Sequence, residues 1–191
     1  MKVANVFLFI FLILPLFLKA QLALLPSVGV QIPNGDFSSK NYLGSDFGAN
    51  LALKYEITES FDMGLLVGYH RFSFDVENQT NAMFPVLILF EKRIGVYQFQ
   101  PLVGIDLGVY TLYHSEIIKK EGASLSMSRS TTNPGCAPTL GFCYQFSRNF
   151  GLHAVAKYNV MYQKESPSTY VSLNVGLNIR FSKERSKYIR F

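Results

Sequence analysis

The stretch TYVSLNVGLNIRF (residues 169–181) alternates between apolar and polar residues along almost its whole length. The apolar positions are Val171, Leu173, Val175, Leu177, Ile179 and Phe181. The intervening positions are polar or small, and comprise Ser172, Asn174, Gly176, Asn178 and Arg180. Successive side chains of a β-strand point to opposite faces, so this period of two predicts a strand with one apolar and one polar face.

Seven further segments share this period, and none carries a convincing 3.6-residue helical stripe. They are residues 24–32, 45–56, 61–74, 84–93, 98–113, 137–147 and 150–163. Strands of about 9–15 residues exceed the usual length of about 5–6 and suit tilted strands that cross a membrane. The chain of 191 residues fits one domain. We therefore predict an all-β fold, an antiparallel up-and-down transmembrane β-barrel of about eight strands over residues 21–181.

The connections between these segments alternate in length. Short turns are predicted at 55–60, 91–98 and 147–150, and longer or more polar loops at 33–44, 75–83, 114–136 and 164–168. Short turns at one end and longer loops at the other are typical of outer-membrane barrels. The longest loop is expected at 114–136.

The first twenty residues have the order of a secretory signal peptide. Lys2 supplies a positive charge, residues 6–18 are nearly all apolar, and Ala20 is a small residue at a plausible cleavage point. Pro15 interrupts the apolar stretch, which is too short for a comfortable transmembrane helix. We predict that residues 1–20 are removed after export, and that the mature chain can enter a membrane only as a closed barrel.

Alternation alone leaves open whether the apolar face points outward to lipid or inward, as in a soluble lipocalin-type carrier. Aromatic residues of the apolar phase gather at both strand ends, as in the aromatic girdles of transmembrane barrels. Those at the short-turn end are Tyr55, Phe61, Phe90, Phe99, Phe146, Phe150 and Phe181, and those at the long-loop end are Phe47, Tyr69, Phe84, Tyr113 and Tyr162. This distribution favours an outward apolar face.

The polar phase carries most of the charged residues of the predicted strands. They are Lys54, Glu56, Asp62, Glu91, Arg93, Asp106, Lys157 and Arg180, and His153 shares this phase. A lysine facing lipid at the bilayer midplane would cost about 2–4 kcal/mol, whereas inside a narrow barrel the two signs can pair. We predict a structural ionic network in the lumen.

The remaining features exclude several classes of function. The formal net charge of +5 lies in the leader and in the tail after Phe181, so the body is neutral and no nucleic-acid partner is expected. Cys136 and Cys143 lie on opposite faces of one strand, about 23 Å apart, and cannot pair within it. No spacing suits a metal, and no cofactor is expected.

Two groups of residues are candidates for a catalytic triad. His114, Ser115 and Glu116 are adjacent in the chain, and adjacent strand residues point to opposite faces. His70 and Asp75 lie near the loop end of another strand. Neither group shows the spatial convergence that a serine–histidine–acid triad needs, so no catalytic residue is predicted.

Four stretches resemble the small bacterial outer-membrane β-barrel domain family of the OmpA/OmpX transmembrane type. They are GVQIPNGDF (29–37), YQFQPLVGIDLGVY (97–110), PTLGFCYQFSRNFGLHAVAKY (138–158) and TYVSLNVGLNIRF (169–181). The resemblance implies this fold, contact with outer-membrane lipid, and insertion by the barrel-assembly machinery, which typically reads a final strand ending in an aromatic residue such as Phe181. Residues 182–191 depart from the pattern and are expected to form a basic periplasmic tail.

Three functions remain open from these observations. The leading hypothesis is a non-enzymatic protein of the bacterial outer membrane, structural or binding extracellular partners through its loops, chiefly 114–136. The alternative is an accessory component of a secretion or assembly system that docks a periplasmic partner through residues 182–191. The third is a narrow pore or a lipid-modifying barrel enzyme.

Overall fold

The computed structural model describes residues 21–34, 43–74, 79–95, 98–120, 123–163 and 166–181. Regular structure in these residues consists of β-strands: β1 (Gln21–Asn34), β2 (Leu43–Gly44), β3 (Asp46–Thr58), β4 (Phe61–Phe74), β5 (Gln79–Arg93), β6 (Phe99–Lys120), β7 (Ala123–Gln145), β8 (Phe150–Met161) and β9 (Ser168–Phe181). Within them, no helix has the length and hydropathy needed to span a bilayer. The proposed signal peptide (1–20) and tail (182–191) lie outside the described residues.

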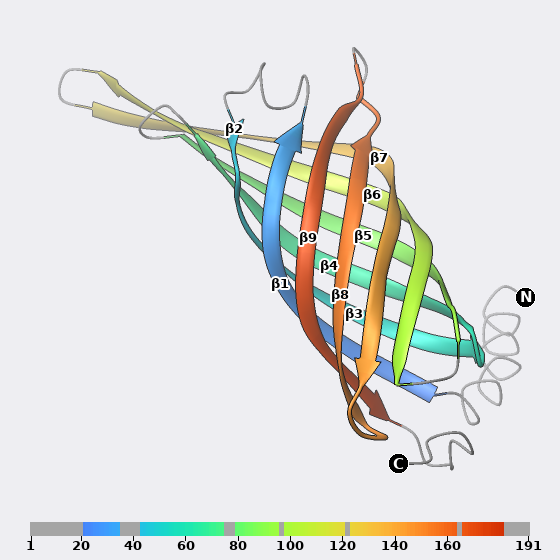
Figure 1. The fold of residues 1–191 in the computed structure, drawn as a ribbon. Coiled ribbons are helices and arrows are strands. Elements are labelled where there is room, and N and C mark those ends of the chain that lie inside the picture. Colours follow the sequence, from blue (N-terminus) through green and yellow to red (C-terminus); the bar gives the residue numbers. More distant parts are fainter. Residues whose placement is uncertain are drawn as a thin grey trace, which may run out of the picture.

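The strands close into an antiparallel barrel (Figure 1). From β3 to β9 each strand pairs with the next along the chain, and β1 closes the wall by pairing with both β3 and β9. The two-residue β2 pairs with the end of β4 and continues the position of β3 in the wall, so the wall has eight strands. The predicted all-β, up-and-down barrel of about eight strands is confirmed.

Three of the connections lie at the end of the barrel where β1 starts and β9 finishes. Glu59 and Ser60 link β3 to β4, residues 94–98 link β5 to β6, and residues 146–149 link β7 to β8. In the second connection Gly95 has φ of 89°, a left-handed conformation that favours glycine. The predicted short turns at 55–60 and 147–150 are confirmed. The strand ends at Arg93 and Phe99 fit the short connection predicted at 91–98, of which residues 96–97 lie outside the described residues.

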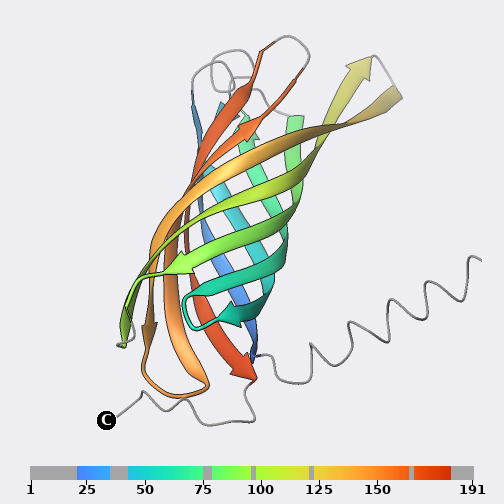
Figure 2. The same cartoon turned by 90° about the vertical axis from the view of Figure 1, so that its right-hand side faces the viewer.

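The predicted loop at 114–136 is wrong. β6 and β7 pair without interruption from Phe99↔Tyr144 to Lys120↔Ala123, so only two residues separate the strands. The strand predicted at 84–93 is also longer than expected. β5 begins at Gln79, within the predicted loop 75–83. A strand above the membrane has water on both faces and needs no apolar phase, because backbone hydrogen bonds and residues such as Thr131 and Thr132 support it. The hairpin extends well beyond the barrel wall (Figures 1 and 2).

The apolar phase of the strands faces outward. On β9, Leu173 and Val175 are 48% and 57% exposed, whereas Ser172 and Asn174 between them are 1% and 3% exposed. The same contrast runs around the wall, with exposed apolar residues on every full-length strand. A soluble carrier with an apolar interior is therefore excluded, because the apolar phase lies outside and most of the polar phase is enclosed.

The outward aromatic residues form contacts across neighbouring strands. At the long-loop end, the ring centroids of Tyr69 and Phe84 are 5.2 Å apart, and Phe84 lies 5.2 Å from Tyr113. At the short-turn end, Phe99 and Phe142 are also 5.2 Å apart. Phe181, the expected insertion signal, is the exposed last residue of β9 and lies opposite Leu22 of β1. These rings border an apolar outer band, as at the two interfaces of a bilayer.

Candidate functional site

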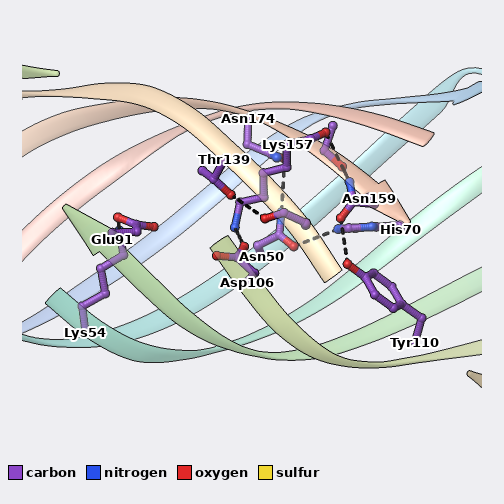
Figure 3. Close-up of polar contacts among 12 residues, drawn as sticks. Asn50, Lys54, His70, Glu91, Asp106, Tyr110, Thr139, Lys157, Asn159 and Asn174 are labelled. Atoms are coloured by element: carbon purple, nitrogen blue, oxygen red, sulfur yellow. Dashed lines mark hydrogen bonds and ion pairs between the residues drawn. The ribbon is translucent and has the colours of Figure 1, made fainter. Parts of the chain in front are cut away.

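The interior of the barrel contains three groups of ion pairs. Lys157 Nζ lies 2.5 Å from Asp106 Oδ2, and both side chains are buried (Figure 3). Lys54 pairs with Glu91. Each pair reaches across an intervening strand, since Lys157 is on β8 and Asp106 on β6, while Lys54 is on β3 and Glu91 on β5. The pairs therefore cross-link the wall from inside.

The third group lies toward the short turns. Arg93 on β5 has Nη2 2.5 Å from Glu56 Oε1 on β3, and Nε 2.9 Å from Asp62 Oδ2 on β4. Asp62 lies opposite both Glu56 and Glu91 in the sheet, so acidic residues occupy one row across three strands. Arg93 offsets two of these charges. Arg180 lines a small interior cavity together with Glu56, Asp62 and Arg93, but forms no ion pair among the described residues.

A neutral hydrogen-bond network occupies the other half of the interior. His70 Nε2 lies 2.8 Å from Asn50 Oδ1, and His70 Nδ1 lies 3.0 Å from the hydroxyl of Tyr170. The Asn50 amide donates to Asn174 Oδ1 at 3.1 Å. This network fixes His70 between two strands, so the structure assigns it a bonding role in the lumen. Asp75, its candidate triad partner, lies outside the described residues.

A second branch joins β1, β6, β8 and β9. Ser172 donates to Gln31 at 2.5 Å, and Asn159 Nδ2 donates to Ser172 Oγ at 2.8 Å. The Tyr110 hydroxyl donates to Asn159 Oδ1 at 3.1 Å (Figure 3). The prediction from charged residues missed this neutral network. Its signal was available, because these residues lie on the same strand phase as the charges.

Large apolar and aromatic side chains fill the interior beside this network. They are Phe72, Met83, Leu87, Tyr110, Met161 and Tyr170, all at most 1% exposed. Tyr170 is at the centre, with ring centroids 5.4 Å from Phe72, 5.7 Å from His70 and 6.3 Å from Tyr110. These side chains together are called the Tyr170 plug. The sequence did not predict it, because Phe72, Met83 and Met161 are apolar residues on the polar phase.

Glycines make room for the interior charges. A Cβ at Gly64 would lie 3.1 Å from Lys54 Cγ, and one at Gly104 would lie 2.8 Å from Glu91 Cγ. These two glycines therefore flank the two members of one ion pair. Any larger residue would have to displace the pair or the adjoining backbone, because interiors are close-packed.

Little free space remains inside the barrel. Two interior cavities hold about 20 Å³ each, one next to Arg93 and Arg180 and the other next to Lys157 and Asn174. This is room for about one water molecule per cavity. Both are lined by His153, whose Nδ1 has no hydrogen-bond partner among the described residues. The described interior is filled, which is expected for an eight-stranded barrel.

The filled interior predicts that the barrel does not conduct ions. Purified protein inserted into planar lipid bilayers is expected to give no discrete conductance steps, because an ion would have to displace the Tyr170 plug and the ion pairs. A variant with Phe72, Met83 and Met161 all replaced by alanine serves as the opened comparison. Discrete steps from the unmodified protein would contradict the prediction and favour a pore.

The other candidate residues show no catalytic arrangement among the described side chains. Cys143 is buried and accepts hydrogen bonds from Gln145 and Asn178 at 3.0 Å each, while Cys136 lies on the opposite face near the Tyr162 hydroxyl. His114 lies opposite Arg129 in the hairpin, and the side chains of Ser115 and Glu116 are not described. The described residues contain no group of three or more histidine, cysteine, aspartate or glutamate side chains that could hold a metal ion.

Comparison with solved structures identifies the architecture. Neisserial surface protein A matches with a TM-score of 0.63 and 14% identity, covering 85% of this chain and 99% of that protein. A major outer-membrane protein of Thermus thermophilus matches with a TM-score of 0.60 and 12% identity, over 85% and 99% of the two chains. The fold is that of a small outer-membrane β-barrel. The resemblance noted in the sequence is thereby confirmed for the fold.

A third small outer-membrane β-barrel is the attachment invasion locus protein Ail of Yersinia pestis, with a TM-score of 0.56 and 18% identity over 85% and 99% of the chains. Neither the family models nor the curated proteins that were compared with the sequence gave a match. The likeness is thus one of architecture at low identity. Residue roles must come from this chain's own geometry.

Proposed function

We propose that this protein is a non-enzymatic β-barrel of the bacterial outer membrane that binds extracellular molecules through its β6–β7 hairpin. The outer-membrane fold, the outward apolar band and the filled interior support a scaffold that displays a binding element. The hairpin above the barrel, residues 114–132, is named the β6–β7 projection. Two of the structural neighbours are named as an attachment invasion locus protein (Ail) and a surface protein (Neisserial surface protein A).

The observation that carries this proposal is that most of the projection is not paired with the wall; only residues 114–116 pair with β5. The ladder between β7 and β8 ends at Gly135↔Met161, and that between β5 and β6 ends at Gln79↔Glu116. Beyond these points β6 and β7 pair only with each other among the described strands. With respect to the described residues, the β7 edge over residues 123–132 is therefore unpaired, and an open strand edge offers backbone donors and acceptors to a partner.

The side chains of the projection suit polar binding. Residues 128–132, with the sequence SRSTT, are all exposed and carry four hydroxyl groups and one guanidinium. Binding residues commonly lie on exposed segments held by a rigid scaffold. Here the scaffold is the cross-linked barrel. β6 pairs with β7 without interruption from Phe99 to Lys120, so the barrel holds the projection in place.

Shortening the projection is expected to weaken binding and leave the barrel folded. Tyr113 and Ser130 lie opposite each other, so residues 114–129, which include Arg129, can be replaced by Asn-Gly, which favours a two-residue hairpin turn. Bacteria displaying this variant should bind immobilised extracellular-matrix proteins and glycans about tenfold less than bacteria displaying the full chain. The control replaces Glu59 and Ser60 by Asn-Gly at the opposite end. Equal binding by all three proteins would contradict the proposal.

A further inference from the structure

The outer wall of the barrel is not evenly convex. A hollow of about 690 Å³ lies on its outside, across β1, β3, β4, β5 and β9, and its lining is almost entirely apolar. Its lining residues include the exposed side chains of Val28, Leu51, Val67, Val175 and Leu177. This surface belongs to the lipid-facing band, so its neighbours in a membrane are acyl chains.

A short outward side chain, that of Ala49, helps to form the hollow. Ala49 lies opposite Val28 on one side and Tyr69 on the other, so it is a short side chain between larger ones. Gly68 and Gly176 are on the inward phase, so only their backbone atoms border the hollow. The depression is therefore built into the sequence of the strands and does not depend on a loop.

An aromatic pair and a cation border the hollow at the extracellular end. Tyr69 and Phe84 form part of its lining and contact each other edge to face. Arg71 follows Tyr69 by two residues on the same outward face of β4, and its side chain is 51% exposed. Among the outward-phase strand residues whose side chains are described, Arg71 is the cation at this end, and Lys92 is at the other.

Asp46 positions Arg71 without enclosing it. Asp46 Oδ2 lies 3.2 Å from Arg71 Nε, so the carboxylate occupies one edge of the guanidinium. Arginine has five N–H donors in a planar fork, and the remaining donors are on the two Nη atoms. A planar guanidinium binds phosphate through paired hydrogen bonds.

We propose that the hollow and Arg71 together form a binding site for a phosphate-bearing lipid of the outer leaflet. One acyl chain lies in the hollow against Val28, Leu51 and Val175, and the lipid phosphate accepts hydrogen bonds from the Nη groups of Arg71. The Tyr69–Phe84 pair marks the level where chain meets headgroup. The proposal rests on the outer-membrane placement proposed above, and is independent of the β6–β7 projection.

Native mass spectrometry of the detergent-solubilised full chain tests this site. The probes are diphosphorylated lipid A and the same lipid with its phosphates removed. We expect one diphosphorylated molecule to remain bound per protein, about tenfold more tightly than the dephosphorylated one. Equal retention of the two lipids by the folded barrel would overturn the role of Arg71.

Matched variants separate the two parts of the site. Arg71→Gln should remove the preference for the phosphorylated lipid, whereas Lys92→Gln, at the opposite end, should keep it. Ala49→Phe fills the hollow and should weaken the binding of both lipids. Ala156→Phe, at an exposed site on β8, should weaken the binding of neither. Unchanged lipid binding by the Ala49→Phe variant would overturn the role of the hollow as the site of the acyl chain. A chain that does not insert into lipid vesicles at all would instead refute the outer-membrane placement.

Discussion

Replacing Lys157 by methionine is expected to lower the free energy of unfolding by about 3–5 kcal/mol. The substitution leaves Asp106, whose side chain is fully buried, without its cation in a narrow interior. Removing one member of a buried pair is costly because the other charge stays desolvated. Urea unfolding of the protein in lipid vesicles, followed by circular dichroism and by mobility in gel electrophoresis, measures the loss.

Two further variants isolate the cause of that loss. The double substitution Lys157→Met with Asp106→Leu should recover most of the stability, because an apolar pair of similar volume replaces a buried ion pair at little cost. Arg71→Gln breaks the exposed pair with Asp46 and should change stability by only about 0–1 kcal/mol. If Lys157→Met were as mild as Arg71→Gln, the interior pair would not be a desolvated cross-link.

The second large effect is expected on the outer face. Leu107 is 44% exposed on β6, next to the interior Asp106, and lies at mid-strand. Leu107→Lys places a charge in the hydrocarbon region and should cost about 2–4 kcal/mol in vesicles. Urea unfolding of the vesicle-embedded barrel again measures the difference.

The matched control for this effect is Ile57→Lys. Ile57 is 46% exposed, similar to Leu107, but is close to the short turn that follows β3. Near the interface the cost falls to about 0–1 kcal/mol. Equal, small costs at both positions would show that the outer face is not in lipid, and the placement of this barrel in a membrane would be wrong.

Both predictions concern the contrast between strand faces, which the sequence already carries. The alternation in residues 169–181 identifies β9 and assigns Leu173 outward and Asn174 inward, because a strand has a strict period of two. The same rule brought all eight charged residues of the polar phase to the interior side of the wall. It works wherever one face meets lipid, since only there does the apolar signal persist.

The rule failed where its physical basis ends. Above the membrane both faces of a strand meet water, so residues 114–136 carry no apolar phase. They were predicted as a loop, although most of them form the β6–β7 projection. Inside the barrel, the plug around Tyr170 and Phe72 interrupts the expected polar phase. An enclosed position accepts any side chain that fills its space, so period alone cannot foresee it.

The sequence by itself determined that this chain forms long amphipathic strands, which faces are apolar, and which residues lie on the interior side, because these follow from local period and composition. Only the tertiary structure decided that Lys157 pairs with Asp106 and Lys54 with Glu91, each across an intervening strand. It alone also brought Ala49, Gly68 and Gly176 together at the outer hollow. The physical reason is register: the phase of a residue gives its face, but its height in the wall depends on how far neighbouring strands are shifted as the barrel closes.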